Sequence, residues 1–217
     1  YPMAGMPSET VKLHVRKASK KGKTTVIKTN GPDNEYLTNI SWTPDSKNIL
    51  IAELNREQNH MYLNMYDAES GKLLRTLFEE THDKYVEPQH PASFVPGQDD
   101  QFIWQSRRSG FNHLYLYNTE GEMLKQLTNG PWEVSKLVGF DKKAQHIIIE
   151  GTKESPIERH IYAVDMNTGD MKKISREAGV HHGSLSPNGS MLIDNFSSTE
   201  VPNAYRIYTS DGELIQE

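Results

Sequence analysis

Cysteine is the first residue type that the 217-residue sequence lacks. Its absence excludes disulfides, cysteine-based zinc sites and a cysteine nucleophile. The chain also has no apolar run of about 18 residues, the length that a membrane-spanning helix requires, so we predict no membrane span. Its 24 lysine and arginine residues do not exceed its 29 acidic residues, and we therefore expect no nucleic-acid partner.

Catalytic signatures are missing as well. The sequence contains no Gly-x-Ser-x-Gly word, so it has no nucleophile elbow. Ser184 has His181 and His182 close by, but a strand-turn-strand context is wrong for a catalytic serine. Neighbouring residues on a strand point to opposite faces, so the two histidines would not share a metal ion. His82 and His90 are better placed for a metal, but we predict no catalytic residue, no metal and no cofactor.

A hairpin word, by contrast, is written three times. It begins at His60 as HMYLNMYDAESGKLLRTL, at His113 as HLYLYNTEGEMLKQLT and at His160 as HIYAVDMNTGDMKKIS. Each copy has a β-prone run, a turn containing glycine and a second run. The three histidines occupy equivalent positions, so we expect each to form hydrogen bonds inside its own repeat.

Two landmarks show that the repeat runs through most of the chain. An aromatic residue or leucine precedes a polar turn at Trp42, Phe94, Phe140 and Leu185, after spacings of 52, 46 and 45 residues. The turn glycines Gly71, Gly121, Gly169 and Gly212 follow with spacings of 50, 48 and 43 residues. Each period has room for four short strands, and a period of roughly 40–50 residues with four strands is typical of a β-propeller.

The predicted fold is therefore all-β, a β-propeller fragment of about four and a half four-stranded blades. The consecutive apolar residues at 49–52 and 146–150 agree, because a blade is covered on both faces. A β-sandwich is the alternative, although sandwiches rarely repeat at a fixed period. We read the basic run at 16–23 as a solvated hairpin loop. The expected limits are a half blade at 9–29 and blades at approximately 36–78, 84–128, 133–175 and 180–217.

The longer connections, from second to third strand and from blade to blade, all leave from one end of the predicted blades. Loops held by a rigid scaffold commonly carry function. In the segment YVEPQHPASF, Glu87 precedes an innermost strand, and Pro88 and Pro91 stiffen the chain around it. Its carboxylate could hold an amine, or could be a solvated loop acid. Glu87, Gln89 and His90 are our candidates for contacts on the substrate side.

Several words resemble the dipeptidyl peptidase IV family of serine peptidases. YPMAG at 1–5 is similar to that family's Tyr-Pro-x-Ala-Gly motif. Residues 109–134 resemble a second family motif, which contains HLYLY (here 113–117) and ends in WEV (here 132–134). The resemblance covers the whole chain and looks closest to bacterial members. It implies a propeller, in a parent that releases N-terminal dipeptides with proline second. The family has substrate-side contacts in the loop that matches 84–90, where this sequence has Glu87-Pro88 instead of the mammalian Phe-Arg.

The resemblance also implies partners. The family's triad lies in an α/β-hydrolase domain that follows the propeller, and we expect that domain to begin after Glu217. This chain would then be a non-catalytic part that caps and gates a peptidase site and admits short peptides. The alternative is a stand-alone propeller scaffold of the bacterial envelope. Exposed blade faces would favour a homodimer, and the resemblance suggests the periplasm or cell envelope as location.

Overall fold

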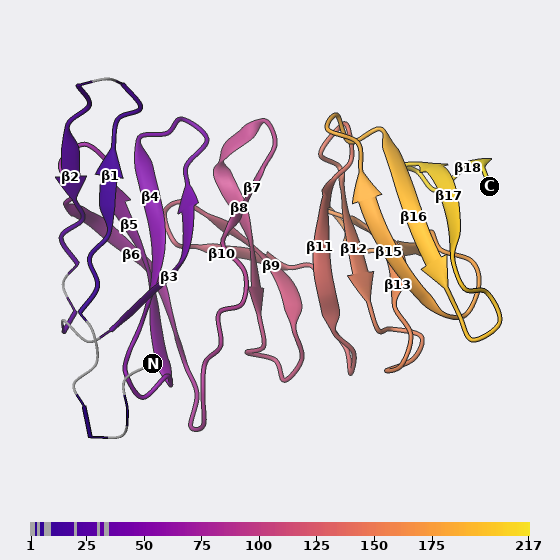
Figure 1. Ribbon diagram of the computed structural model, residues 1–217, viewed down its shortest axis with the longest axis horizontal. Helices are drawn as coiled ribbons and strands as arrows, with labels where there is room; N and C mark the ends of the chain where they lie inside the picture. Colours follow the sequence, from indigo (N-terminus) through magenta and orange to yellow (C-terminus); the bar gives the residue numbers. More distant parts are fainter. Residues whose placement is uncertain (1–2, 4, 7–9, 20, 30, 33–34) are drawn as a thin grey trace. The chain divides into compact units, whose positions relative to one another are not determined.

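The protein is built from strands, as the all-β prediction requires. The computed structural model describes residues 3, 5–6, 10–19, 21–29, 31–32 and 35–217, and within these ranges it contains strands and no helix (Figure 1). Three residues of the YPMAG word, Tyr1, Pro2 and Ala4, lie outside the described residues. In the described ranges there is accordingly no helical segment able to cross a bilayer.

The strands form one two-stranded and four four-stranded sheets, which confirms the predicted propeller fragment. The half blade pairs β1 (His14–Arg16) with β2 (Thr24–Val26). Blade one contains β3 (Tyr36–Trp42), β4 (Asn48–Leu54), β5 (His60–Asp67) and β6 (Leu73–Thr81). Blade two contains β7 (Ser93–Val95), β8 (Gln98–Ser106), β9 (His113–Asn118) and β10 (Met123–Gln126). Blade three contains β11 (Val134–Phe140), β12 (His146–Gly151), β13 (His160–Asp165) and β14 (Met171–Lys173), and blade four β15 (Val180–Leu185), β16 (Met191–Ser197), β17 (Ala204–Thr209) and β18 (Leu214–Gln216).

The chain divides into two compact units. The first comprises residues 1–94, 98–105 and 117–124, and the second residues 95–97, 106–116 and 125–217. The first unit holds the half blade and blade one, the second holds blades three and four, and the division passes through the sheet of blade two.

The second strands of blades one and three, β4 and β12, show why apolar residues occupy consecutive positions instead of alternate ones. In β4 every residue from Ile49 to Leu54 is buried, and in β12 every residue from Ile147 to Gly151 is buried. Side chains of successive strand residues point to opposite faces, so both faces of these sheets are covered. In β16 burial alternates instead, and Met191 and Ile193 on one face are 41% and 45% exposed.

Apolar side chains join neighbouring blades within each unit. In the first unit, Ile27 beside the half blade packs in one cluster with Ile49, Ile51 and Tyr66 of blade one. In the second unit, the cluster that joins blades three and four contains Ile148, Ile161, Ala163, Ile174, Leu192 and Tyr208. Burial of apolar area stabilises by about 25 cal/mol per Å², so these clusters provide much of the blade-to-blade attraction.

The four landmark glycines have a second role besides forming turns. A Cβ atom on Gly71 or Gly121 would lie 2.1 Å from the carbonyl oxygen of Val26 or Leu77 respectively. On Gly169 it would lie 3.0 Å from the carbonyl oxygen of Leu127, and on Gly212 it would lie 3.3 Å from the side chain of Ile174. In each case the turn between the third and fourth strands closes against the preceding blade, at its last strand or at the residue that follows this strand. Gly71, Gly121 and Gly169 therefore lie where two backbones meet, whereas Gly212 faces a side chain.

A side chain on each last strand strengthens the same joint. Thr25 Oγ1 donates a hydrogen bond of 3.0 Å to the Glu69 carbonyl oxygen. Fifty residues further on, Arg75 pairs with Glu120, and Lys125 and Lys172 then donate to the carbonyl oxygens of the two following turns, at Asn167 and Asp211. A polar side chain thus reaches the next turn in four successive joints.

Candidate functional site

The connections in each blade separate into two sets because successive antiparallel strands reverse direction. Turns from first to second strand and from third to fourth strand leave at one end of a blade. Connections from second to third strand, and from blade to blade, leave at the other end, which we call the long-loop end. From blade one onward it comprises residues 55–59, 82–92, 107–112, 127–133, 152–159, 174–179 and 198–203.

Exposed apolar side chains in loops occur at the long-loop end. Tyr85, Phe111 and Ile157 are 57%, 38% and 84% exposed. The described turn residues at the opposite end include no exposed large apolar side chain. Single exposed apolar residues are common on protein surfaces, but among the connections between described strands they are restricted to this class in both units, which indicates connections that meet a partner.

The three predicted site residues lie together in the connection 82–92. Gln89 Nε2 donates a 3.1 Å hydrogen bond to Glu87 Oε2, and both side chains are exposed. His90 is half-buried, and burial lowers its pKa below the ordinary value. The loop is anchored through Val86, which is buried and donates its N–H to the Gln58 carbonyl oxygen at 2.7 Å. The Glu87 carboxylate is therefore presented to solvent on a loop with a fixed base.

The described residues contain no candidate metal site. There, no three His, Asp or Glu side chains are grouped so that they could hold an ion. His82, one of the two better candidates, uses its Nδ1 to accept the Lys84 N–H at 3.0 Å. His82 therefore helps to shape the 82–92 connection.

Several side-chain contacts hold the connections that flank β9 and β10, at 107–112 and 127–133. Arg107 forms a two-pronged ion pair with Glu133, in which Nη2 lies 3.0 Å from Oε2. Asn112 Nδ2 donates to the Val134 carbonyl oxygen at 2.6 Å, and Trp132 Nε1 donates to the Asn129 carbonyl oxygen at 2.8 Å. These contacts fix the connections 107–112 and 127–133 against each other.

The three repeated histidines form hydrogen bonds within their own blades, as predicted. His60 Nε2 lies 2.8 Å from Glu79 Oε2. His113 Nδ1 contacts Thr128 Oγ1 at 3.1 Å, and His160 Nδ1 contacts Ser175 Oγ at 2.9 Å. Each of these two hydroxyl oxygens also accepts the N–H of the residue after the histidine. A hydroxyl that donates to Nδ1 while accepting that N–H requires a neutral ring, protonated on Nε2.

Acidification should destabilise the protein through these two rings. Burial lowers the pKa of both His113 and His160, whereas an unfolded histidine titrates near about 6.5. The unfolded chain therefore binds protons first as the pH falls through about 6.5, and stability decreases by about 1.4 kcal/mol per pH unit for each ring until its folded pKa is reached. Urea unfolding between neutral and mildly acidic pH measures this slope.

The carboxylates contribute a slope of their own, so a variant isolates the histidine part. His160→Gln should show a shallower loss of stability over the same pH interval than the original chain. An unchanged slope in His160→Gln would contradict the assignment.

His181 and His182 point to opposite faces of β15, in agreement with the sequence argument. His181 is fully buried, with Nδ1 2.8 Å from Asp194 Oδ2 and Nε2 3.0 Å from the Glu177 carbonyl oxygen. The His182 side chain is 62% exposed and contacts Glu150. Ser184 lies on the same strand. His181 is thus a structural residue of the joint between blades three and four.

Buried acids are the polar residues that sequence reasoning missed. Glu150 accepts the Gly183 N–H at 2.9 Å and lies 3.3 Å from Lys136 Nζ. Glu53 accepts a hydrogen bond from Tyr66 Oη, and burial followed by this bond raises the pKa of Tyr66 far above its ordinary value. The available signal was a glutamate at the same place after the apolar runs of β4 and β12.

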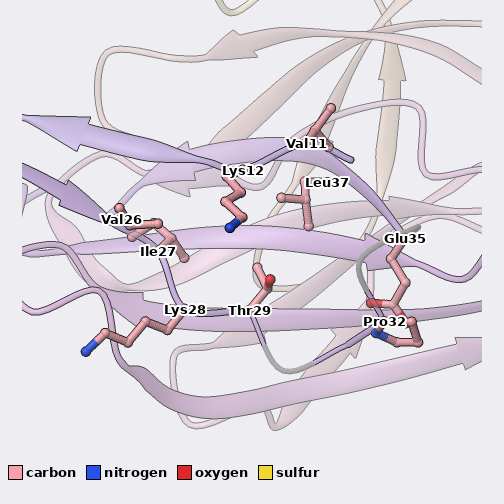
Figure 2. Close-up of a pocket in the computed structure, with 9 residues that line it drawn as sticks. All are labelled: Val11, Lys12, Val26, Ile27, Lys28, Thr29, Pro32, Glu35 and Leu37. Carbon is pink, nitrogen blue, oxygen red and sulfur yellow. The ribbon is translucent and has the colours of Figure 1, made fainter. Parts of the chain in front are cut away.

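A pocket of about 250 Å³ lies in the first unit, beside the half blade (Figure 2). Figure 2 shows Lys12 directed into the group of lining residues and Lys28 directed away from it. Burial, and after it the charge of Glu53, raises the pKa of Glu35 at its rim. None of the predicted site residues lines this pocket.

Comparison with known proteins decides the family. Residues 1–203 match the model of the dipeptidyl peptidase IV N-terminal region. The chain belongs to this family. The dipeptidyl peptidase IV resemblance of the sequence is thereby confirmed.

Relatives and solved structures agree. A protein of Trichophyton verrucosum named as a dipeptidyl-aminopeptidase B is 30% identical, over 93% of this chain and 24% of its own length. A Bacteroides ovatus structure described as a dipeptidyl aminopeptidase IV has a TM-score of 0.88 at 35% identity, and covers 98% of this chain and 32% of its own. The Porphyromonas gingivalis dipeptidyl peptidase 4 structure also has a TM-score of 0.88, at 27% identity over all of this chain and 30% of its own. The chain thus spans about a quarter of the length of the curated relatives that it matches.

Proposed function

We propose that this chain is the non-catalytic part of a propeller that caps and gates the active site of a dipeptidyl peptidase IV-like serine peptidase. The parent would release N-terminal Xaa-Pro dipeptides, and its α/β-hydrolase domain would be the partner of the long-loop end. The observation that carries the proposal is that, among the connections between described strands, the exposed large apolar residues Tyr85, Phe111 and Ile157 all lie at the long-loop ends of their blades. A cap of this kind excludes unfolded chains and large proteins by size and admits short peptides.

We further propose Glu87, Gln89 and His90 as contacts on the substrate side. Support comes from the exposed, anchored carboxylate of Glu87 and from its position at the long-loop end. A carboxylate there can pair with the amino group of a peptide. The blade limits at 9–29, 36–78, 84–128, 133–175 and 180–217, and a homodimer, stay predictions.

The alternative is a stand-alone scaffold of the bacterial envelope. A scaffold would also use exposed loop residues, but its parent would have no peptidase activity. Hydrolysis of a chromogenic Xaa-Pro substrate by the parent protein therefore discriminates between the two functions.

Ile157→Lys tests the cap in the parent protein. Because Ile157 is 84% exposed, its replacement should leave the blades folded but place a charge in the contact with the peptidase domain. Burying an unpaired charge is strongly unfavourable, so the variant should begin to cleave a long unfolded polypeptide and should retain hydrolysis of a short substrate. The rate of hydrolysis is measured as a function of substrate length for the original parent protein and for its Ile157→Lys variant.

Met123→Lys is the matched control. Met123 is 49% exposed on β10, an edge strand of blade two that lies outside the long-loop end. This variant should keep the original dependence on substrate length. Equal behaviour of the two variants would contradict the assignment of the long-loop end to the cap.

A further inference from the structure

Three asparagines in the chain are followed by glycine, at Asn30, Asn129 and Asn188. This dipeptide is chemically labile because glycine has no Cβ to hinder its own nitrogen. That nitrogen can attack the asparagine side-chain carbonyl carbon and form a five-membered succinimide. Asn30 lies outside the described residues, so the structure distinguishes the other two sites.

Asn188 is held in a form that opposes this reaction. Its Oδ1 accepts hydrogen bonds from Ser186 Oγ at 2.8 Å, Ser190 Oγ at 2.7 Å and Ser190 N at 3.2 Å. The attacking nitrogen is also engaged, since Gly189 N donates to the Ser186 carbonyl oxygen at 2.9 Å. Gly189 is buried against the backbone at Phe140. Ring closure at Asn188 would break several of these contacts.

Asn129 has the opposite environment. Asn129 and Gly130 are both exposed, and Gly130 has a φ of 122°. Within the described chain, no hydrogen bond holds the Asn129 side chain or the Gly130 N–H. The Asn129 carbonyl oxygen accepts the Trp132 Nε1–H at 2.8 Å. A hydrogen bond to a carbonyl polarises its peptide group and makes the adjoining N–H more acidic, which favours attack by that nitrogen.

We infer that Asn129 is a site of spontaneous deamidation, whereas Asn188 is protected by the fold. The Gly130 nitrogen gives its proton to solvent and bonds to Asn129 Cγ, while the Cγ–Nδ2 bond breaks and ammonia leaves. Water then opens the ring at either carbonyl carbon. Opening at Cγ gives aspartate, and opening at the main-chain carbonyl gives isoaspartate. One water is consumed and one ammonia released, with no change of oxidation state.

The product would alter the connection 127–133. Isoaspartate brings Cβ into the main chain, between Cα and Cγ of residue 129, and converts the main-chain carbonyl that accepts from Trp132 Nε1 into a carboxylate on a branch. The lengthened chain leads directly into Gly130, whose carbonyl oxygen contacts His113 Nε2. Both products also add a negative charge to the connection 127–133, which contains Glu133, the ion-pair partner of Arg107. The modification would therefore loosen the connection 127–133 at the long-loop end.

Peptide mapping of the aged 217-residue chain tests the inference. The folded protein is incubated at mildly alkaline pH, digested and analysed by mass spectrometry, and enzymatic methylation of isoaspartyl groups provides a second readout. Conversion at Asn129 should be roughly tenfold or more faster than at Asn188, because breaking even one hydrogen bond in the ring-closing step costs about that factor. Asn129→Gln, which removes the labile dipeptide at this position, should abolish the corresponding isoaspartyl signal.

Denatured protein supplies the control. In strong denaturant the two dipeptides lose their different environments, so their rates should become similar. Equal rates in the folded chain, or faster conversion at Asn188, would overturn the inference. A large difference that persisted in denaturant would equally overturn it, because the fold would then not be its cause.

Discussion

Gly121→Ala should lower the free energy of unfolding much more than Gly97→Ala. Both glycines have positive φ, of 93° and 78°, so both variants incur about 1–2 kcal/mol of backbone strain. Only at Gly121 does the new Cβ meet another backbone, 2.1 Å from the Leu77 carbonyl oxygen, whereas at Gly97 nothing lies within 4 Å. Overpacking adds a further cost of about 1–3 kcal/mol.

Urea unfolding of the two variants measures the difference. The midpoint should fall further for Gly121→Ala, with the dependence on urea concentration unchanged. Equal midpoints would show that the added Cβ at Gly121 causes no further loss of stability. They would contradict the close approach of the turn to the strand of the preceding blade.

Asp194→Ala should be the most damaging single replacement of an acid in the second unit. The His181 and Asp194 side chains are both fully buried and lie 2.8 Å apart. Both ring nitrogens of His181 lie within hydrogen-bond distance of an oxygen, Nδ1 of Asp194 Oδ2 and Nε2 of the Glu177 carbonyl. Removing one partner of such a buried pair costs about 3–5 kcal/mol because it leaves the other without compensation.

Two comparisons make the Asp194 prediction specific. Asp170→Ala, at an exposed turn acid, should change stability by no more than about 0.5 kcal/mol. The double replacement of His181 by Phe and Asp194 by Leu should recover much of the loss, since apolar residues of similar volume often replace buried ion pairs without cost. A loss below about 1 kcal/mol in Asp194→Ala would contradict a stabilising role of the pair.

Much of the fold could be predicted from the sequence because each repeat contains the same landmarks and therefore predicts the same four-stranded unit. The landmark glycines and the turns after Trp42, Phe94, Phe140 and Leu185 keep step, and consecutive apolar runs indicate sheets covered on both faces. The half blade was expected within residues 9–29, but the sequence did not define the ends of its strands. Its observed strands are three residues each, β1 and β2.

The contacts between residues of different blades could not be predicted from the sequence. Glu150 binds Gly183, a residue 33 positions away, and no local pattern announces such a contact. The glycine landmarks were correctly read as turn residues, but their contact with the preceding strand depends on how blades pack. Candidate residues such as Glu87 were selected from loop position, and its hydrogen bond to Gln89 depends on side-chain geometry that the sequence does not reveal.

The joint between blades has a direction. Each blade supplies a glycine turn to the blade before it, and most also supply a last-strand side chain to the blade after it, as Arg75 and Lys125 do. Such head-to-tail contacts use two different surfaces, unlike the self-complementary contacts of a two-fold pair. A duplicated segment of one period would bring both surfaces with it and could join its neighbours without new contacts. Gene duplication could therefore change the number of blades while leaving every existing joint intact.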